Sequence, residues 1–416
     1  MSERRLATLK GFYQNYVKPS YEMAHKAREE GKLVAWVAST FPVEILHAMD
    51  IIPVWPENYA SLCATRKVSV PLCESAERKG FSKDLCSYAR CVLGSLFDGE
   101  NLPEGGIPKP DILVASTCAC DTHMKWFQVA SRIFKKPLFL LDVPYNVDSA
   151  SPEQLEDRYV QHYVCQLEDL VSRLEKYSKM KLVDSKLRKT LTLSNKTSEL
   201  WLKVQEYRKS VPTPMGAREA FSAVYFMLCV PGTEQAVGFY EELCAELEQR
   251  VKQGVGIIED EKYRLVWDNL PLWFDLQFFQ YLETLKAVVV AETFSHVWAG
   301  GLNPSKPYES LARKHLSNMA NCTIERRIEL IAALVKDFRA NGVILPTNWG
   351  CRMMTIGETM VKEKIQEMTD VSSLILDVDS TDWRNYDEFK VKTKLETYLR
   401  TLNSLFKIGE TRRSAL

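Results

Sequence analysis

Short apolar runs alternate with helical patterns near both ends of the chain, and this alternation constrains the fold more than any other feature. Toward the N-terminus the β-rich runs are LVAWVAST (33–40), IIPVW (51–55), DILVAST (111–117) and PLFLLDVPY (137–145). Segments between them, such as PVEILHAMD and HMKWFQVASRIF, carry apolar residues at helical spacing. Strands that alternate with helices predict βαβ units and a parallel sheet.

The C-terminal part repeats this pattern. Its runs are YRLVWDN (263–269), AVVVAETF (287–294), NGVILPTNW (341–349) and SSLILDVDS (372–380). The third runs of the two halves align position for position, from Ile112 to Cys120 and from Val343 to Cys351. We therefore expect an α/β protein with two similar parallel-sheet domains, as an old duplication would leave.

The middle of the chain is predicted to be mostly helical. EQLEDRYVQHYVCQLEDLVSRLEKYSKM has apolar residues three and four apart, and SVPTPMG (210–216) breaks the pattern with two prolines and a glycine. The expected organisation has three parts. They are an N-terminal α/β domain with a helical N-terminal extension (1–151), a helical connecting region (152–258) and a C-terminal α/β domain (259–416).

The charge balance excludes some classes of partner. Lys+Arg and Asp+Glu both number 54, and no basic stripe predicts nucleic-acid binding. No apolar run approaches the roughly 18 residues of a membrane span. The start, MSERRLATLKGFYQNY, lacks the apolar core of a signal peptide. We expect a cytoplasmic protein with no membrane or nucleic-acid partner.

Eleven cysteines is a large number for a compartment that keeps thiols reduced, so metal or redox chemistry gains weight. Cys120 and Cys351 both follow the third strand of their half. Ligands of open α/β sheets bind at the carboxyl ends of strands. If the two halves face each other, these two thiolates point into one cleft.

A third thiol comes from KGFSKDLCSYARC. We interpret Ser82 as a helix N-cap, which puts Cys86 in the first turn, where backbone N–H groups favour a thiolate. Cys91 lies roughly 140° further around that helix and is predicted to be a core residue. The same core interpretation applies to Cys165, Cys229 and Cys244.

Three cysteines from dispersed elements suit an iron–sulfur cluster with one open iron site. Zinc held by three protein ligands and water is the rival, although HExxH and paired CxxC motifs are absent. The motifs GxGxxG, GxxxxGK[ST] and GxSxG are absent too. We therefore do not expect the chain to bind a dinucleotide, hydrolyse ATP or use a serine nucleophile by means of these motifs.

Three polar residues are candidates for the same cleft. Ser39 and Glu57 follow the first two strands, and a carboxylate there can work as an acid or base. A helix-capping or solvated glutamate is the equally favoured alternative. His123 follows Cys120 by three residues and could line the site, but the pattern favours a partly buried structural histidine.

The segments WPENYA, LCESAERKGFSKDLCSYAR, CDTHMKWF, EDEKYR and NWGCRMM together strongly resemble the 2-hydroxyacyl-CoA dehydratase and benzoyl-CoA reductase family. The resemblance covers nearly the whole chain, in order, and is strongest to the α-type (B) subunit of the dehydratases. It implies Rossmann- or flavodoxin-like domains and a [4Fe–4S] cluster held by Cys86, Cys120 and Cys351. It also implies that Ser39 and Glu57 line the substrate site beside the open iron.

The resemblance further implies a radical mechanism and two kinds of protein partner. An ATP-hydrolysing activator with its own [4Fe–4S] cluster would inject one electron. The electron would convert an (R)-2-hydroxyacyl-CoA into a ketyl radical anion that expels the 2-hydroxyl group, giving the 2-enoyl-CoA. The chain would pair with a related β-type subunit, although a homodimer stays open.

Several alternatives remain at this stage. Cys118 could replace Cys120 as the ligand. A double-cubane cluster would use adjacent cysteine pairs, and the sequence contains no CC. The functional rivals are the B-type subunit of an ATP-dependent benzoyl-CoA reductase, a non-catalytic electron-transfer or double-cubane protein and, more remotely, a zinc hydrolase.

Overall fold

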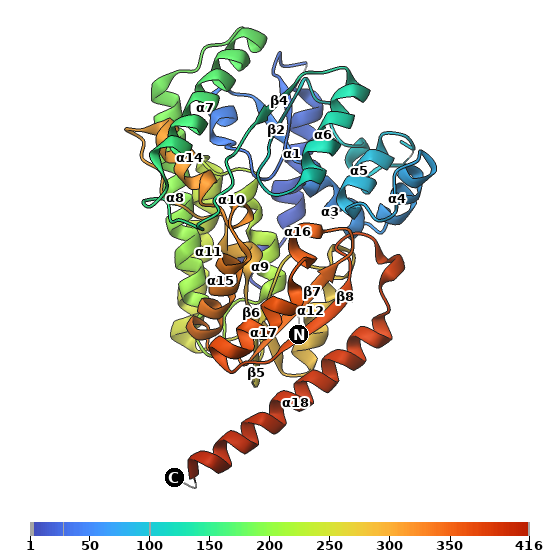
Figure 1. The fold of residues 1–416 in the computed structure, drawn as a ribbon, viewed down its shortest axis with the longest axis vertical. Coiled ribbons are helices and arrows are strands. Elements are labelled where there is room, and N and C mark those ends of the chain that lie inside the picture. Colours follow the sequence, from blue (N-terminus) through green and yellow to red (C-terminus); the bar gives the residue numbers. More distant parts are fainter. Residues whose placement is uncertain (1–3, 28, 100, 415–416) are drawn as a thin grey trace.

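The computed structural model describes residues 4–27, 29–99 and 101–414, and it contains two four-stranded parallel sheets (Figure 1). The first sheet consists of β1 (Val34–Val37), β2 (Ile52–Val54), β3 (Ile112–Ser116) and β4 (Leu138–Leu141). The second consists of β5 (Tyr263–Trp267), β6 (Ala287–Glu292), β7 (Gly342–Asn348) and β8 (Ser373–Val378). All eight strands lie within the predicted runs, so the α/β class and both parallel sheets are confirmed.

Both sheets have the same topology. Their strand orders are β2-β1-β3-β4 and β6-β5-β7-β8, and every neighbouring pair is parallel. In each sheet the order reverses between the first and third strands. A crevice opens at such a switch point, outside the carboxyl ends of the strands.

Burial explains why the strand sequences are nearly continuous apolar runs. Every residue of β1, β3, β5 and β6 is buried, whereas β4 and β8 at the sheet edges are partly exposed. A parallel sheet is covered by helices on both faces, so alternation of polar and apolar residues is lost.

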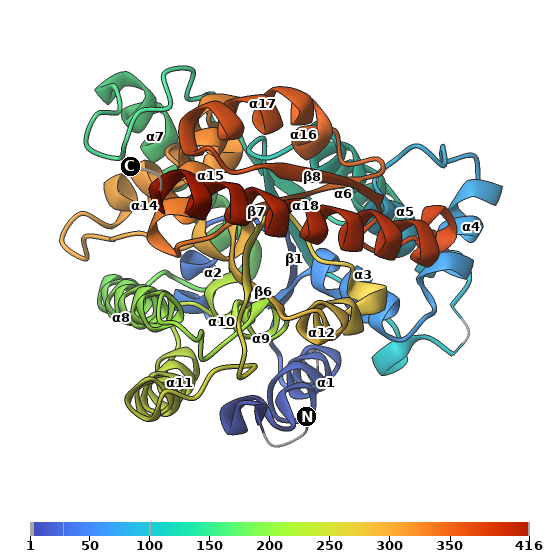
Figure 2. The same ribbon diagram turned by 90° about the horizontal axis from the view of Figure 1, so that it is seen from below.

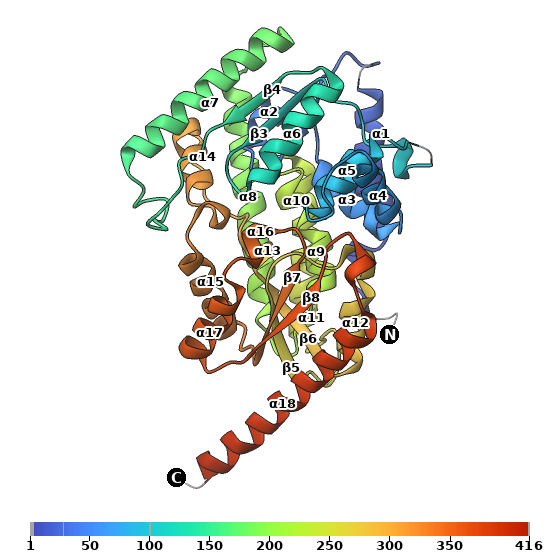
Figure 3. The ribbon, with the colours of Figure 1, turned by 45° about the vertical axis from the view of Figure 1, so that its right-hand side comes forward.

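Some helices of the N-terminal part pack on the first sheet, and others form a group to one side of it (Figure 3). The helices of this part are η2 (Ala7–Leu9), η3 (Tyr13–Val17), α1 (Lys18–Lys26), α2 (Glu44–Ala48), α3 (Pro56–Thr65), α4 (Ser69–Arg78), α5 (Ser87–Ser95), η4 (Pro103–Gly105) and α6 (Asp121–Phe134). Cys91 of α5 is fully buried, so its core interpretation is confirmed.

The middle of the chain is helical, as predicted. It forms α7 (Asp157–Ser178), α8 (Asp184–Arg208), α9 (Ala217–Ala223), α10 (Tyr225–Leu228) and α11 (Glu234–Gln253), and α8 and α11 lie side by side (Figure 2). Tyr163, Trp201 and Tyr240 of these helices share one hydrophobic core with Trp36 of β1. The division of the chain at 151 and 258 stays a prediction.

Two of the three cysteines interpreted as core residues in this region are buried, namely Cys229 and Cys244. The prediction for Cys165 was wrong, because its side chain is exposed. The buried face of α7 is formed by residues such as Tyr163 and Leu167, and Cys165 lies on the other face.

Most of the C-terminal helices flank the second sheet, whereas the helix Pro307–Leu316 packs against α7 and α8. The helices of this part are η5 (Trp273–Asp275), α12 (Gln277–Thr284), α13 (Thr293–His296), α14 (Pro307–Leu316), η6 (Met319–Asn321), α15 (Ile324–Asp337), α16 (Arg352–Thr355), α17 (Glu358–Thr369), η7 (Trp383–Asn385) and α18 (Glu388–Ser414). Helix α18 packs beside β8 and then extends away from the body (Figure 1). None of the helices in the described part of the chain is long and apolar enough to cross a membrane.

Helices α4 and α5 touch at Gly94, and this contact predicts a stability difference between two glycine variants. A Cβ at Gly94 would lie 1.8 Å from the carbonyl oxygen of Leu72, whereas a Cβ at Gly238 of α11 would meet nothing within 4 Å. We expect Gly94→Ala to lower the free energy of unfolding by about 1–3 kcal/mol through overpacking. Gly238→Ala is the matched control and should raise it by about 0.5–1 kcal/mol. Urea unfolding of both variants measures this, and equal effects would contradict the close contact.

Candidate functional site

A cavity of about 220 Å³ lies where the carboxyl ends of the strands of both sheets meet. Its wall combines loops after β1, β2, β3, β5, β6 and β7 with the start of α5 and with helices α9 and α10. Most of the lining is aromatic or aliphatic, including Trp126, Phe221 and Phe294, and a few polar groups converge on it. Such a combination is typical of a small-molecule site.

All three predicted cysteines border this cavity, namely Cys86, Cys120 and Cys351. Each of them is the N-cap residue of the helix that follows, respectively α5, α6 and α16. Backbone N–H groups of the first helical turns therefore point toward the sulfur atoms. Unpaired N–H groups at a helix start favour a negatively charged sulfur.

The expected helix start at Ser82 was wrong. The backbone N–H of Asp84 donates to the Ser82 hydroxyl at 3.2 Å, which closes a short turn, and α5 begins only at Ser87. A side chain that caps its own local turn competes with helix formation. Cys86 is consequently the cap itself rather than a residue of the first turn.

A glycine lets the two halves of the chain meet at the cysteines. Gly350 has φ +76°, and a Cβ on it would lie 2.7 Å from the carbonyl oxygen of Leu85 and 2.9 Å from the backbone nitrogen of Cys86. Any other L-residue here would clash with that peptide and adopt a strained backbone. The absence of a side chain at Gly350 brings the loop of Cys351 against the loop of Cys86.

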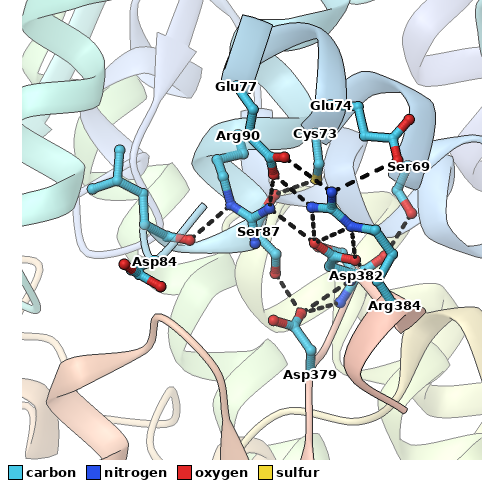
Figure 4. Close-up of polar contacts among 12 residues, drawn as sticks. Ser69, Cys73, Glu74, Glu77, Asp84, Ser87, Arg90, Asp379, Asp382 and Arg384 are labelled. Atoms are coloured by element: carbon cyan, nitrogen blue, oxygen red, sulfur yellow. Dashed lines mark hydrogen bonds and ion pairs between the residues drawn. The ribbon is translucent and has the colours of Figure 1, made fainter. Parts of the chain in front are cut away.

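A buried polar network fixes the same junction (Figure 4). The hydroxyl of Ser87 donates to Asp379 at 2.5 Å, and the guanidinium of Arg90 lies 2.8 Å from a carboxylate oxygen of Asp382. Arg90 and Asp382 are almost fully buried, and Arg384 donates to both Asp382 and Glu77. Because separating these buried, paired charges would be costly, the start of α5 is held to the loop after β8.

Burial raises the pKa of two of the thiols. The pKa of Cys86 rises to about 11 and that of Cys351 to about 12, first because both are buried and second because each has another cysteine sulfur nearby. Thiols that are costly to ionise side by side become thiolates when a cationic metal centre binds them.

Cys120 behaves differently because of His123. Burial acts to raise the pKa of Cys120, but the neighbouring imidazole of His123 outweighs it and lowers the pKa. Burial acts to lower the pKa of His123, and Cys120 and Glu57 outweigh this and raise it well above its ordinary value. Each of the two groups therefore favours the charged form of the other.

Glu57 is anchored on one oxygen only. Its Oε1 accepts from the backbone N–H of Ser39 at 3.0 Å and lies 2.9 Å from Nε2 of His123. Its Oε2 is buried and has no hydrogen-bond partner in the described part of the chain. The predicted placement of Ser39 and Glu57 in one cleft holds, and one carboxylate oxygen is left for a ligand.

The structure differs from the sequence interpretation at His123. This residue lines the cavity instead of serving the core, and it joins Cys120 to Glu57. Its position three residues after Cys120, on the first turn of a helix that starts at the cavity, was the available signal. Cys118 is buried away from the lining residues, and burial raises its pKa to about 12, so Cys120 is the one that faces the cavity.

The three cysteines fit a group larger than one ion. They border the cavity from three sides, while no set of three His, Cys, Asp or Glu side chains among residues 4–27, 29–99 and 101–414 converges as the ligands of a single metal ion. In a four-iron cluster each thiolate binds a different iron, so its ligands stand further apart than those of zinc. If the three cysteines hold such a cluster, one iron would lack a cysteine ligand, and Glu57 and His123 line the same cavity.

The family model described as "2-hydroxyglutaryl-CoA dehydratase, D-component" matches residues 38–402. The chain belongs to this family. The match begins next to Ser39 and includes every residue of the site above.

Named relatives of the family are similar along nearly their whole length. The chain is 26% identical to the (R)-phenyllactyl-CoA dehydratase alpha subunit of Clostridium sporogenes, with 90% of each chain covered. It is 29% identical to the B subunit of benzoyl-CoA reductase from Thauera aromatica, with 92% of each covered. It is 25% identical to the (R)-2-hydroxyisocaproyl-CoA dehydratase alpha subunit of Clostridioides difficile, with 98% of this chain and 99% of that one covered.

The Cys120–His123 pair predicts a pH-dependent reactivity in metal-free protein. Because the thiolate is the nucleophile and the pKa of Cys120 is lowered, Cys120 should react with iodoacetamide faster near pH 7 than Cys86 or Cys351. In His123→Gln the inflection of the rate against pH should move to higher pH. Mass spectrometry of alkylated peptides measures this, with His162→Gln, on an exposed histidine, as the control. An unchanged inflection in His123→Gln would contradict the pairing.

Proposed function

We propose that the chain is the iron–sulfur subunit of an (R)-2-hydroxyacyl-CoA dehydratase, which eliminates water to give a 2-enoyl-CoA. Cys86, Cys120 and Cys351 would hold a [4Fe–4S] cluster at the cavity, and Glu57 and Ser39 would form the substrate side. The observation that carries the proposal is that three helix-capping thiols and a half-anchored carboxylate line one cavity.

The cluster, when bound, would supply one electron and an open iron that polarises substrate oxygen. The protein residues would handle the protons. The free Oε2 of Glu57 would accept the proton from carbon 3 of the substrate, while the Ser39 N–H keeps the other oxygen in position. His123, whose pKa is raised by Cys120 and Glu57, would protonate the departing hydroxyl group.

The rest of the lining supports a CoA thioester as the ligand. The aromatic walls exclude water from a reactive radical, which strengthens each electrostatic contact inside. Arg352 also lines the cavity, is exposed, and forms no ion pair with any described residue. Its guanidinium complements a phosphate group of CoA.

The proposal includes partners in the cytoplasm. The relatives are named as alpha or B subunits, so we infer a related second subunit for this chain as well, with a homodimer as the alternative. An ATP-dependent [4Fe–4S] activator would deliver the electron.

Metal content is the first test of the proposal. Protein purified without oxygen should contain about four iron atoms and four acid-labile sulfides per chain. Cys351→Ala should lose both together, whereas Cys165→Ala, on the exposed face of α7, should keep them. About eight iron atoms would indicate a double cubane. Zinc in place of iron, or no iron after anaerobic reconstitution, would overturn the proposal.

Glu57→Gln tests the role of the carboxylate. The amide keeps the size and can still accept from the Ser39 N–H, but it cannot take a proton, so kcat should fall about 10²-fold or more. Iron content should match the wild type, because Glu57 is not among the three cysteine ligands. Glu156→Gln, on the exposed surface, is the matched control. Full turnover by Glu57→Gln with normal iron would refute the role.

A second candidate is the B-type subunit of an ATP-dependent benzoyl-CoA reductase. It is favoured by the 29% identity to the Thauera aromatica protein, which is as high as that to the dehydratase subunits above. Anaerobic assays with the reconstituted complex and its activator would separate the two. Ring reduction of benzoyl-CoA without turnover of 2-hydroxyacyl-CoA thioesters would favour the reductase.

A further inference from the structure

A second cavity, of about 270 Å³, lies beside the first. It is enclosed by α1, by β2 with the residues before it, and by the segment that joins α10 to α11. Its lining combines apolar side chains with polar and charged ones, among them Lys32, His47 and Asp50. The apolar part includes Ile51, Ile52, Pro53, Val54 and Val230.

The two cavities share a wall only one side chain thick. Trp55, Asn58, Tyr225 and Cys229 line both of them. Trp55, Tyr225 and Cys229 are buried, so the wall belongs to the interior of the molecule. None of these four side chains carries a charge. An uncharged group that lies between the two cavities would therefore meet no charged side chain in the shared wall.

Hydrogen bonds hold the wall from the side of the second cavity. The hydroxyl of Tyr225 donates to the Ser20 hydroxyl at 3.1 Å, and the hydroxyl of Tyr21 donates to Oδ1 of Asn58 at 2.9 Å. Ser20 and Tyr21 line the second cavity and not the first. The Tyr225 ring is held at its tip by this hydroxyl–hydroxyl contact, and it also packs against the rings of Phe12 and Phe226 at centroid distances of 5.9 and 5.6 Å.

The wall also adjoins the reactive end of the first cavity. Trp55 and Asn58 flank Glu57 in the chain, and Glu57 lines only the first cavity. An acyl group whose reacting carbons lie between Glu57 and the cysteines thus meets the shared wall next. Beyond that wall lies the second cavity, part of whose lining is apolar, and the partition itself holds no charged side chain.

We propose that the second cavity is a chamber for the distal, apolar part of the acyl chain, and that Tyr225 is the gate between the two cavities. The chamber rests on the proposed function, because it presumes that the first cavity binds the thioester end. Under this proposal, Tyr225 and residues that line only the second cavity, such as Val230, determine which lengths of acyl chain are bound.

The experiment measures binding, not turnover, on the complete protein prepared without oxygen. Butyryl-, hexanoyl-, octanoyl- and decanoyl-CoA are titrated by calorimetry against the wild type and Val230→Phe, which fills the second cavity. In the wild type, affinity should rise about fourfold for each methylene buried. In Val230→Phe the ratio of decanoyl-CoA to butyryl-CoA affinity should fall at least tenfold.

Two further variants test the gate. Tyr225→Ala should raise the affinity ratio of decanoyl-CoA to butyryl-CoA, and combining it with Val230→Phe should abolish that gain. Val237→Phe is the matched control, because Val237 is half-buried on α11 and lines neither cavity. If Tyr225→Ala does not fold, the comparison of Val230→Phe with the wild type still tests the chamber.

The outcomes separate the chamber from the proposed function. An unchanged ratio in Val230→Phe, with thioesters bound by the wild type, would overturn the chamber and leave the function intact. Failure of the wild type to bind any of the four thioesters would overturn both.

Discussion

The junction between the start of α5 and the loops after β7 and β8 determines the geometry of the site. Gly350 lies against the Leu85–Cys86 peptide, and Arg90 is buried with Asp382. Burying these charges is expensive, and each is matched by more than one partner, because Arg90 also pairs with Glu77 and Asp382 also pairs with Arg384. The position of Cys86 relative to Cys351 therefore depends on residues from the far end of the chain.

The repeated topology explains why the cysteines arrive from different elements at one place. Each sheet reverses its strand order between the first and third strands, and Cys120 and Cys351 follow the third strand of their respective sheets. Because the two carboxyl edges face one cavity, helix starts from both halves present their N–H groups to it. The fold thus concentrates positive ends of backbone dipoles where negatively charged sulfur has to be stabilised.

The sequence predicted the sheets well because their strands are buried on both faces and lack competing patterns. The alignment of Ile112–Cys120 with Val343–Cys351 also predicted which thiols would meet. Periodicity could not predict contacts between distant segments, so the Glu57–His123 pair was missed. Cys165 was assigned to the core although the spacing of Tyr163 and Leu167 puts it on the other face of α7. The start of α5 was misjudged because Ser82 caps a local turn. The ligand roles of the cysteines stay predictions.

The bond between Ser87 and Asp379 joins residues 292 positions apart, and this separation bears on how the protein is made. During synthesis the first sheet can pack while the loop after β8 has yet to leave the ribosome. At that stage Cys86 and Cys120 lie at the carboxyl edge of the first sheet, and the residues of the second sheet that complete the cavity are not yet in place. The cavity is completed only when nearly the whole chain is available, so the full set of lining residues can come together only late in synthesis or after it.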